Sequence, residues 1–482
     1  MAQRVMGLRT TYFWLRESRR SNKVSAKATI LTPRGPVETL EPTLLLAELM
    51  TEGLQKLSDD SDDWRALSKG GIVDMYFEIV TDPGFFTEHV ILVDVLLLGF
   101  NSAVENCSRD VTLSNNVLSR ARDLWKSIWD SREYIRAWPR SKRLPAFQAA
   151  GKFTEPLAYL LGLFHALYWQ RHSFSPPFDT YMPHVGLLLW ERTKGRQDLS
   201  SSATLSLNTL NILNSERTPE FITAYETFSK DAIVNGIGLE AFRLRFEQDT
   251  RRLSNTRDED IEEEDYAHWA LLHQPLRTMD VMIYLMHHDT LGICVELCNA
   301  LSRELRLHLG VYGMVFETVY QLFSLYAGHW YGHLDQDIVL RGDTAVDILA
   351  IAIAFTARAG NGTKVGSARM NEAFLLRICD DLYYLTSFIT VAPDASPSPK
   401  AKFIAECRAH APSQWHQSLT LLTTAMQRGE LNKDTHHRML QYWVDFGRAL
   451  GLKEDKERVR LARLTRTRSR TQWLRTECTL PV

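Results

Sequence analysis

Apolar residues recur at intervals of three and four along most of this chain, and that spacing is the strongest constraint on its fold. The segment 291–308 shows it clearly, with apolar side chains at Leu291, Cys294, Leu297, Cys298, Leu301 and Leu305. Such spacing places one apolar stripe along a helix. Alternating strand patterns with tight-turn dipeptides are scarce. The sequence therefore predicts an all-α protein.

Further segments repeat the pattern, and short polar stretches separate them. The stripe residues are Val315, Val319, Leu322, Phe323, Tyr326 and Trp330, then Val346, Leu349 and Ile353, then Met370, Phe374, Leu375, Ile378, Leu382 and Leu385. Asp343 and Ser367 are placed as helix N-caps, and "GNG" (360–362) ends the helix before it. Helix after helix is typical of armadillo or HEAT arrays, in which each pair buries its stripe on its neighbour.

No repeat motif aligns at the expected period of about 40 residues. We therefore predict a solenoid-like superhelix with irregular repeats, and an irregular helical domain is the alternative. The expected divisions are a basic, disordered arm (1–40), helical arrays (41–256 and 266–390) around an acidic loop (257–265), a Pro/Ser linker (391–402), C-terminal helices (403–460) and an Arg-rich disordered tail (461–482).

Composition excludes several classes of function. The 56 Lys and Arg residues nearly balance 58 Asp and Glu residues, so global charge gives no reason to expect nucleic acid or an anionic membrane as the main partner. The apolar run 90–100 is short and contains Asp94, so no membrane span is expected.

Compartment is predicted from the cysteines and the N-terminus. None of the six cysteines forms a C-x-x-C pair and no secretory signal is present, which favours the reducing cytoplasm or nucleus. Residues 1–37 hold eight basic residues and one acid, Glu17, so a mitochondrial presequence is an alternative.

The best candidate for a metal site is "AGHWYGHLDQD" (327–337). His329 and His333 are four residues apart and share a helix face, and Asp335 could add an oxygen ligand. The zinc-protease pattern, however, requires Glu where Trp330 stands. Aromatic-lined helix packing is the favoured explanation of the pair, so we expect no metal.

Other motifs give no catalytic set. "GNGTKVGS" (360–367) lacks the spacing and the lysine of a phosphate-binding loop, and no G-x-S-x-G elbow occurs. Cys294 and Cys298 lie on a leucine stripe, which favours core thiols. The sequence thus predicts a protein that is not an enzyme and has no cofactor.

The segment "YWVDFGRALGLKEDKERVR" (442–460) resembles the region before the zinc finger in uncharacterised fungal proteins. Those proteins are armadillo-like helical arrays followed by a MYND-type finger. The pattern is carried here by Trp443, Phe446, Gly447, Leu450, Gly451, Leu452, Asp455 and Glu457. The resemblance implies an armadillo-like fold. The apolar spacing itself predicts one more amphipathic helix, which Gly451 ends before a charged helix at 453–460.

The finger itself has no counterpart in this sequence. Only Cys478 follows residue 440, so none of the family's zinc ligands can be carried over. In its place stand seven arginines without an acid among them. They are Arg458, Arg460, Arg463, Arg466, Arg468, Arg470 and Arg475.

Three interpretations of this arginine run stay open. It could contact the phosphates of a polyanion or act as a nuclear import signal, it could be an exposed unfolded end, or the finger's reading frame could be missing. The sequence favours a monomeric, non-enzymatic helical scaffold that binds other proteins. The alternatives are a nucleic-acid-associated or regulatory protein acting through the arginine run, and a metal-dependent enzyme using His329 and His333.

Overall fold

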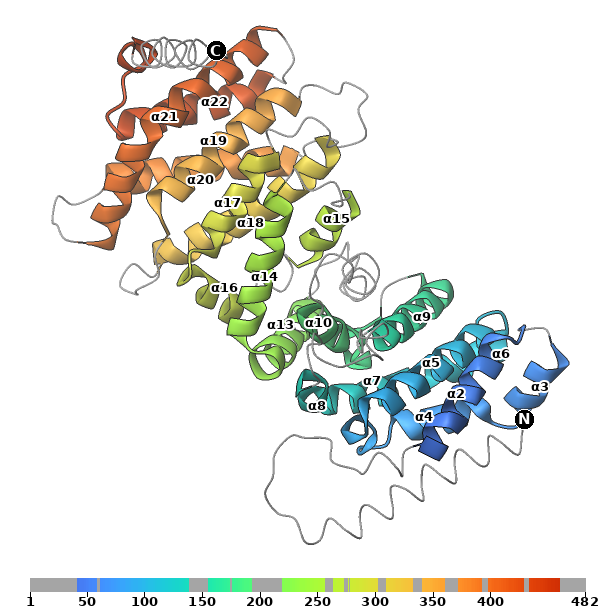
Figure 1. The fold of residues 1–482 in the computed structure, drawn as a ribbon. Helices are drawn as coiled ribbons and strands as arrows, with labels where there is room; N and C mark the ends of the chain where they lie inside the picture. The colour runs from blue at the N-terminus through green and yellow to red at the C-terminus, as the bar shows by residue number, and fades with distance from the viewer. Residues whose placement is uncertain are drawn as a thin grey trace, which may run out of the picture. The chain divides into compact units, whose positions relative to one another are not determined.

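The structure is all-α in every part that it describes (Figure 1). This computed structural model describes residues 41–58, 61–137, 155–173, 176–192, 219–255, 263–272, 276, 278–301, 309–332, 340–359, 372–391, 398–428 and 433–459. No strand occurs among these residues, so the predicted fold class is confirmed. The expected N-terminal arm (1–40) and the tail (461–482) lie outside them.

The chain divides into two compact units, residues 1–242 and 243–482. The division falls inside a continuous helix, α14 (Leu239–Ser254), instead of at the acidic segment 257–265. Periodicity could not reveal it, because the helical pattern runs through the boundary without a break.

The first unit consists of helices joined by short connections. They are α2 (Glu41–Gln55), α3 (Asp62–Lys69), α4 (Ile72–Val80), η3 (Phe85–Thr87), α5 (Val90–Cys107), α6 (Val111–Ser119), α7 (Ala121–Asp130), α8 (Arg132–Ala137), α9 (Glu155–His172), η5 (Phe178–Thr180), α10 (Met182–Arg192), α13 (Pro219–Ser229) and the π-helical η7 (Lys230–Ile237).

Helices α4 and α7 of this unit run in the same direction. Arg120 pairs with Asp74 at 2.7 Å, and the Ser127 hydroxyl donates to the Thr81 carbonyl at 3.0 Å. In each pair, the two residues are 46 positions apart in the chain. Equal offsets at the two ends mean that the helices are parallel and in register.

Helix α10 continues this stack beyond α7. The Trp129 and His184 rings lie 5.3 Å apart, and Lys126 lies 5.6 Å from the centre of the Tyr181 ring just before α10. The separation along the chain is the same in both pairs, so α10 is parallel to α7. Three successive segments therefore stack in one direction, as in a helical array.

Helix α5 is the core helix of the first unit. It packs against α2, α4 and α9, and the buried Asn101 amide donates to the Pro156 carbonyl at 2.9 Å. By length and composition alone α5 could cross a membrane, but 67% of it is buried inside the unit. The apolar run recognised in the sequence ends at residue 100, whereas the helix continues to Cys107.

The second unit has longer helices. After the remainder of α14 they are α15 (Glu263–Leu271), α16 (Met279–Met286), α17 (Thr290–Leu301), α18 (Leu309–Gly332), α19 (Gly342–Ala359), α20 (Glu372–Thr390), α21 (Pro399–Gln427) and α22 (Lys433–Ala449). Together α16 and α17 are also apolar enough to cross a membrane by composition, but they are bent by 81° at their junction.

Three helix pairs, α17–α18, α19–α20 and α21–α22, follow one another in this unit. Helices α19 and α21 are parallel, because Gly342 meets Glu406 near their starts and Ala350 meets Ser418 further along. Helices α18 and α20 are also parallel, because Phe316 contacts Phe374 near the start of α20 and Trp330 contacts Phe388 near its end. The first members of the pairs therefore form one stack and the second members form another.

The repeat is irregular, as the sequence predicts. Residues that face each other across neighbouring parallel helices are separated by 46 to 68 positions. That range explains why no motif aligns at a fixed period near 40 residues. The predicted stripes are buried wherever they are described, and Leu305, Met370 and Ser367 lie outside the described residues.

Several predicted boundaries move by a few residues. Helix α21 begins at Pro399, so 399–402 are not part of the linker, and the Ser398 hydroxyl caps the helix by accepting from the Ala401 N–H. Proline suits the first helical position because its fixed φ is already helical. Helix α15 begins at Glu263, inside the expected acidic loop.

The end of α22 agrees with the sequence. Gly451 has a φ of 82°, and the Leu452 N–H donates to the Gly447 carbonyl at 2.9 Å. A left-handed residue that closes the last turn in this way is the common glycine helix end. A further short helix covers 454–459.

Candidate functional site

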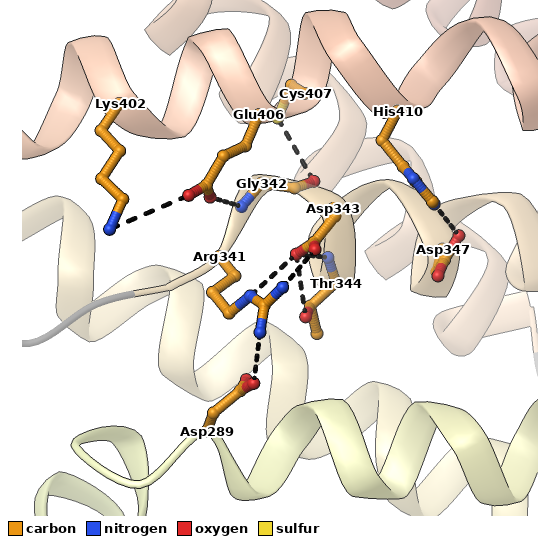
Figure 2. A network of polar contacts seen from close by, with 10 residues as sticks. All are labelled: Asp289, Arg341, Gly342, Asp343, Thr344, Asp347, Lys402, Glu406, Cys407 and His410. Carbon is orange, nitrogen blue, oxygen red and sulfur yellow. Dashed lines mark hydrogen bonds and ion pairs between the residues drawn. The ribbon is translucent and has the colours of Figure 1, made fainter.

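A polar network of the second unit joins the starts of α17 and α19 to α21 (Figure 2). Arg341, immediately before α19, lies at its centre. Its guanidinium donates to Asp289 at 2.9 Å and also to both carboxylate oxygens of Asp343. Asp289 stands just before α17, so one arginine side chain links two successive repeats.

Asp343 lies in the first turn of α19 and not at its N-cap. The helix begins at Gly342, and the Ala345 N–H bonds to the carbonyl of Arg341, which is the capping position. The Asp343 carboxylate instead accepts from the Thr344 N–H at 2.7 Å. The sequence prediction was therefore wrong by two positions, although the acid does serve the positive end of the helix.

The two carboxyl groups bonded to Arg341 have opposite pKa shifts. Burial raises the pKa of Asp289, and the neighbouring Arg341 offsets only part of that effect. Burial also acts on Asp343, but hydrogen bonds from Arg341 and the Thr344 N–H outweigh it and lower the pKa of Asp343. Asp343 therefore keeps its negative charge, and its ion pair with Arg341, to a lower pH than Asp289 does.

Glu406 of α21 completes the link to the third repeat. Its carboxylate accepts from the Gly342 N–H at 2.8 Å, and the Cys407 thiol donates to the Gly342 carbonyl at 3.5 Å. A Cβ on Gly342 would lie 2.3 Å from the Phe403 carbonyl oxygen, so only glycine permits this approach. Lys402 lies 4.0 Å from Glu406.

A second link between α19 and α21 follows one turn further on. His410 Nε2 lies 2.6 Å from Asp347 Oδ1, and both side chains are partly exposed. Because this contact is parallel to the Gly342–Glu406 contact, the two helices are fixed at two successive turns.

This network holds helices together and contains no catalytic set. Each of its carboxylates already accepts from a guanidinium, an imidazole or a backbone N–H, and Glu406 satisfies the first turn of α19. A small pocket beside Arg341 has a mixed lining, with apolar side chains such as Met286, Leu291 and Leu340 and polar ones from Asp289, Thr290, Arg341 and Thr344. We therefore assign the network a structural role.

A different feature stands out on α20 and α22, where three tyrosine rings gather. We call Tyr383, Tyr384 and Tyr442 the tyrosine surface. Tyr383 is 53% exposed and Tyr384 is 61% exposed. The Tyr383 ring lies 5.7 Å from Tyr384 and 5.8 Å from Tyr442, centre to centre.

The sequence of α20 explains why these rings face outward. Ile378, Leu382 and Leu385 are buried, so the positions between them point away from the core. Sequence reasoning identified this stripe but not the two tyrosines beside it. The signal that could have revealed the tyrosines in the sequence is a pair of adjacent aromatic residues beside an apolar stripe.

The candidate metal ligands are only partly described. His329 lies on α18 next to the buried Trp330, whereas His333 and Asp335 are outside the described residues. Within the described part of the chain, no group of three or more His, Cys, Asp or Glu side chains could hold a metal ion. Cys294 and Cys298 are buried, and burial strongly raises the pKa of both thiols.

The arginine run is described only at its first member. Arg458 pairs with Asp455 at 2.9 Å, one turn away on the short helix at 454–459. The other six arginines lie outside the described residues, so their role as a polyanion contact stays a prediction.

No family model matches the chain, and no curated protein matches it. Among solved structures, the chain is similar to a "Circular tandem repeat protein with novel repeat topology and enhanced subunit contact surfaces". The identity is 12%, the coverage is 96% of this chain and 99% of that chain, and the TM-score is 0.29. A similarity at this level carries no argument about function.

Proposed function

We propose that this protein is a non-enzymatic helical scaffold that binds another protein through the tyrosine surface. The observation that carries the proposal is the exposure of Tyr383 and Tyr384 beside Tyr442, on two neighbouring parallel helices. Repeat arrays of stacked helices commonly present such extended binding faces.

The physical chemistry of tyrosine supports this role. A tyrosine ring offers a large apolar area with only two rotatable side-chain bonds, and its hydroxyl can still hydrogen-bond at the rim of an interface. Aromatic residues are accordingly enriched among those that carry most of the binding energy in protein complexes. Three adjacent rings would form the centre of such a contact.

Charged side chains border the tyrosine surface on both helices. Asp380 of α20 and Arg438 of α22 are exposed, one turn before Tyr384 and Tyr442 respectively. A rim with both signs of charge fixes the orientation of a partner more than it adds affinity. The partner segment we expect presents apolar side chains to the rings and a complementary pair of charges to the rim.

The resemblance of residues 442–460 to armadillo-like fungal proteins also favours a scaffold role. Trp443 and Phe446 of that pattern are buried and stacked, with their ring centres 5.3 Å apart. Its apolar positions therefore serve helix packing in this chain. A scaffold role is what the resemblance to armadillo-like fungal proteins implies.

The test begins with proteins that co-purify with the wild-type chain but not with a Tyr383→Ala/Tyr384→Ala variant. Each one is then purified and mixed with the full chain, and amide hydrogen exchange is measured peptide by peptide. We expect slower exchange in α20 and α22 on binding. Direct binding that protects only other helices would reject the tyrosine surface, and the absence of any direct binder would reject the scaffold role.

A further inference from the structure

The outer face of α2, the first described helix of the first unit, carries exposed leucines. Leu45 is 57% exposed and Leu49 is 43% exposed, and they are one turn apart. The opposite face of α2 is buried, with Ala47 and Met50 almost inaccessible. One side of α2 thus packs on the unit, while a second apolar strip faces outward.

Two acids lie along the same exposed strip. Glu48 and Glu52 alternate with the leucines at helical spacing, and both are exposed. Glu52 also lies 3.7 Å from Lys56, in a pair that solvent surrounds. The strip is therefore apolar and acidic in turn, which suits an occupant that is apolar and basic.

The chain has a segment of that character directly before α2. Residues 1–37 contain eight basic residues and one acid, and they include the apolar run Tyr12, Phe13, Trp14 and Leu15. Arginines follow this run at once, at positions 16, 19 and 20. We propose that residues 12–20 dock on α2, with the apolar run covering Leu45 and Leu49 and the arginines facing Glu48 and Glu52.

The connection between the two segments is long enough for this contact. Residues 16–40 separate Leu15 from the start of α2. A chain of that length spans up to about 80 Å when extended, whereas α2 itself is about 22 Å long. The segment can therefore turn back and lie along α2 in either direction.

The energetic reason is that of any terminal repeat. An inner helix of an array is covered by a neighbour on each side, whereas no helix precedes α2 among the described residues. Arrays solve this with a capping element, and residues 12–20 would be such a cap.

Trypsin gives a direct test, because it cleaves after the arginines of the proposed cap. The full-length chain is digested briefly, and cleavage after Arg16, Arg19 and Arg20 is followed by mass spectrometry. We expect cleavage to be about tenfold faster in Leu45→Ser/Leu49→Ser than in the wild type, because a weaker contact raises the open population. The matched control is Val111→Ser, which alters a side chain that is 57% exposed in the same unit.

A second variant guards against misfolding of the first. Glu48→Lys/Glu52→Lys changes only exposed side chains and should also speed cleavage several-fold, with an unchanged melting temperature. Equal cleavage rates in the wild type and both variants would overturn the proposal. Protection that disappears on tenfold dilution would overturn it as well, because a second copy of the chain would then be the occupant.

Discussion

Trp415 and Trp443 exchange hydrogen bonds across the last helix pair. The indole N–H of Trp415 donates to the Trp443 carbonyl at 2.8 Å, and the indole N–H of Trp443 donates to the Trp415 carbonyl at 3.0 Å. Both side chains are buried. Each ring thus supplies apolar area to the core while its one polar atom is satisfied, which joins α21 to α22 without a buried polar cost.

Gly447 allows this arrangement, and its replacement gives the first prediction. A Cβ at position 447 would lie 2.2 Å from the indole of Trp415. We expect Gly447→Ala to lower the free energy of unfolding of the second unit by about 1–3 kcal/mol, because a buried ring must move. Urea denaturation measures the change.

Gly328→Ala is the matched control for Gly447→Ala. Gly328 lies within α18, and a Cβ there would meet nothing within 4 Å. Alanine at an open helical position should stabilise the unit by about 0.5–1 kcal/mol. A loss of the same size at both glycines would contradict the assignment to the Trp415 contact, because a Cβ at Gly328 meets no such neighbour.

Substitutions of Glu406 test the polar link between α19 and α21. Glu406→Ala leaves the Gly342 N–H without its carboxylate acceptor, and we expect a cost of about 1 kcal/mol, similar to the loss of a helix cap. Glu406→Gln keeps an oxygen at the same place and should cost less than half as much. Equal losses in the two variants, measured by urea denaturation, would mean that the hydrogen bond to Gly342 is not the cause.

Asp381 should make the stability of the second unit depend on pH. Burial raises the pKa of Asp381 to about 6, although hydrogen bonds from Tyr320 and Ser324 act in the opposite direction. The unfolded value is near 4, so the folded chain binds the proton more tightly between these limits. The contribution is complete below about pH 4 and is lost as the pH rises through about 6, and it amounts to at most about 3 kcal/mol.

The variant Asp381→Asn isolates this effect. Its unfolding free energy relative to wild type should improve steadily between pH 4 and pH 7, because asparagine has no charged form to bury. Glu317→Gln, which changes an exposed acid on α18, serves as the control. A difference between Asp381→Asn and wild type that stays constant with pH would contradict the assignment.

The sequence was sufficient to predict the helices but not the contacts between them. The stripe through Leu291 and Leu301 needs only local spacing, so its burial could be foreseen. The link between Asp289 and Arg341 joins residues 52 positions apart, and no local pattern records that distance. The same reason hides the exchange between Trp415 and Trp443, since only the stacking of whole helices brings the two rings together.

Boundaries were predicted less well than the helices themselves. The prolines of 391–402 indicated a linker, yet Pro399 opens α21 because proline is well suited to a first helical turn. The tyrosine surface was missed for a different reason. Its three members come from two helices, so only the parallel packing of α20 and α22 makes one surface of them.

Whether the tyrosine surface binds a protein partner is tested most directly by the affinity of the purified partner for the full-length chain. Isothermal titration compares wild type with Tyr383→Ala/Tyr384→Ala and with Tyr134→Ala, a tyrosine of the first unit that is 45% exposed. We predict at least a tenfold increase in Kd for the double variant, as expected when an aromatic anchor is removed, and no change for Tyr134→Ala. An unchanged Kd in the double variant would contradict the account.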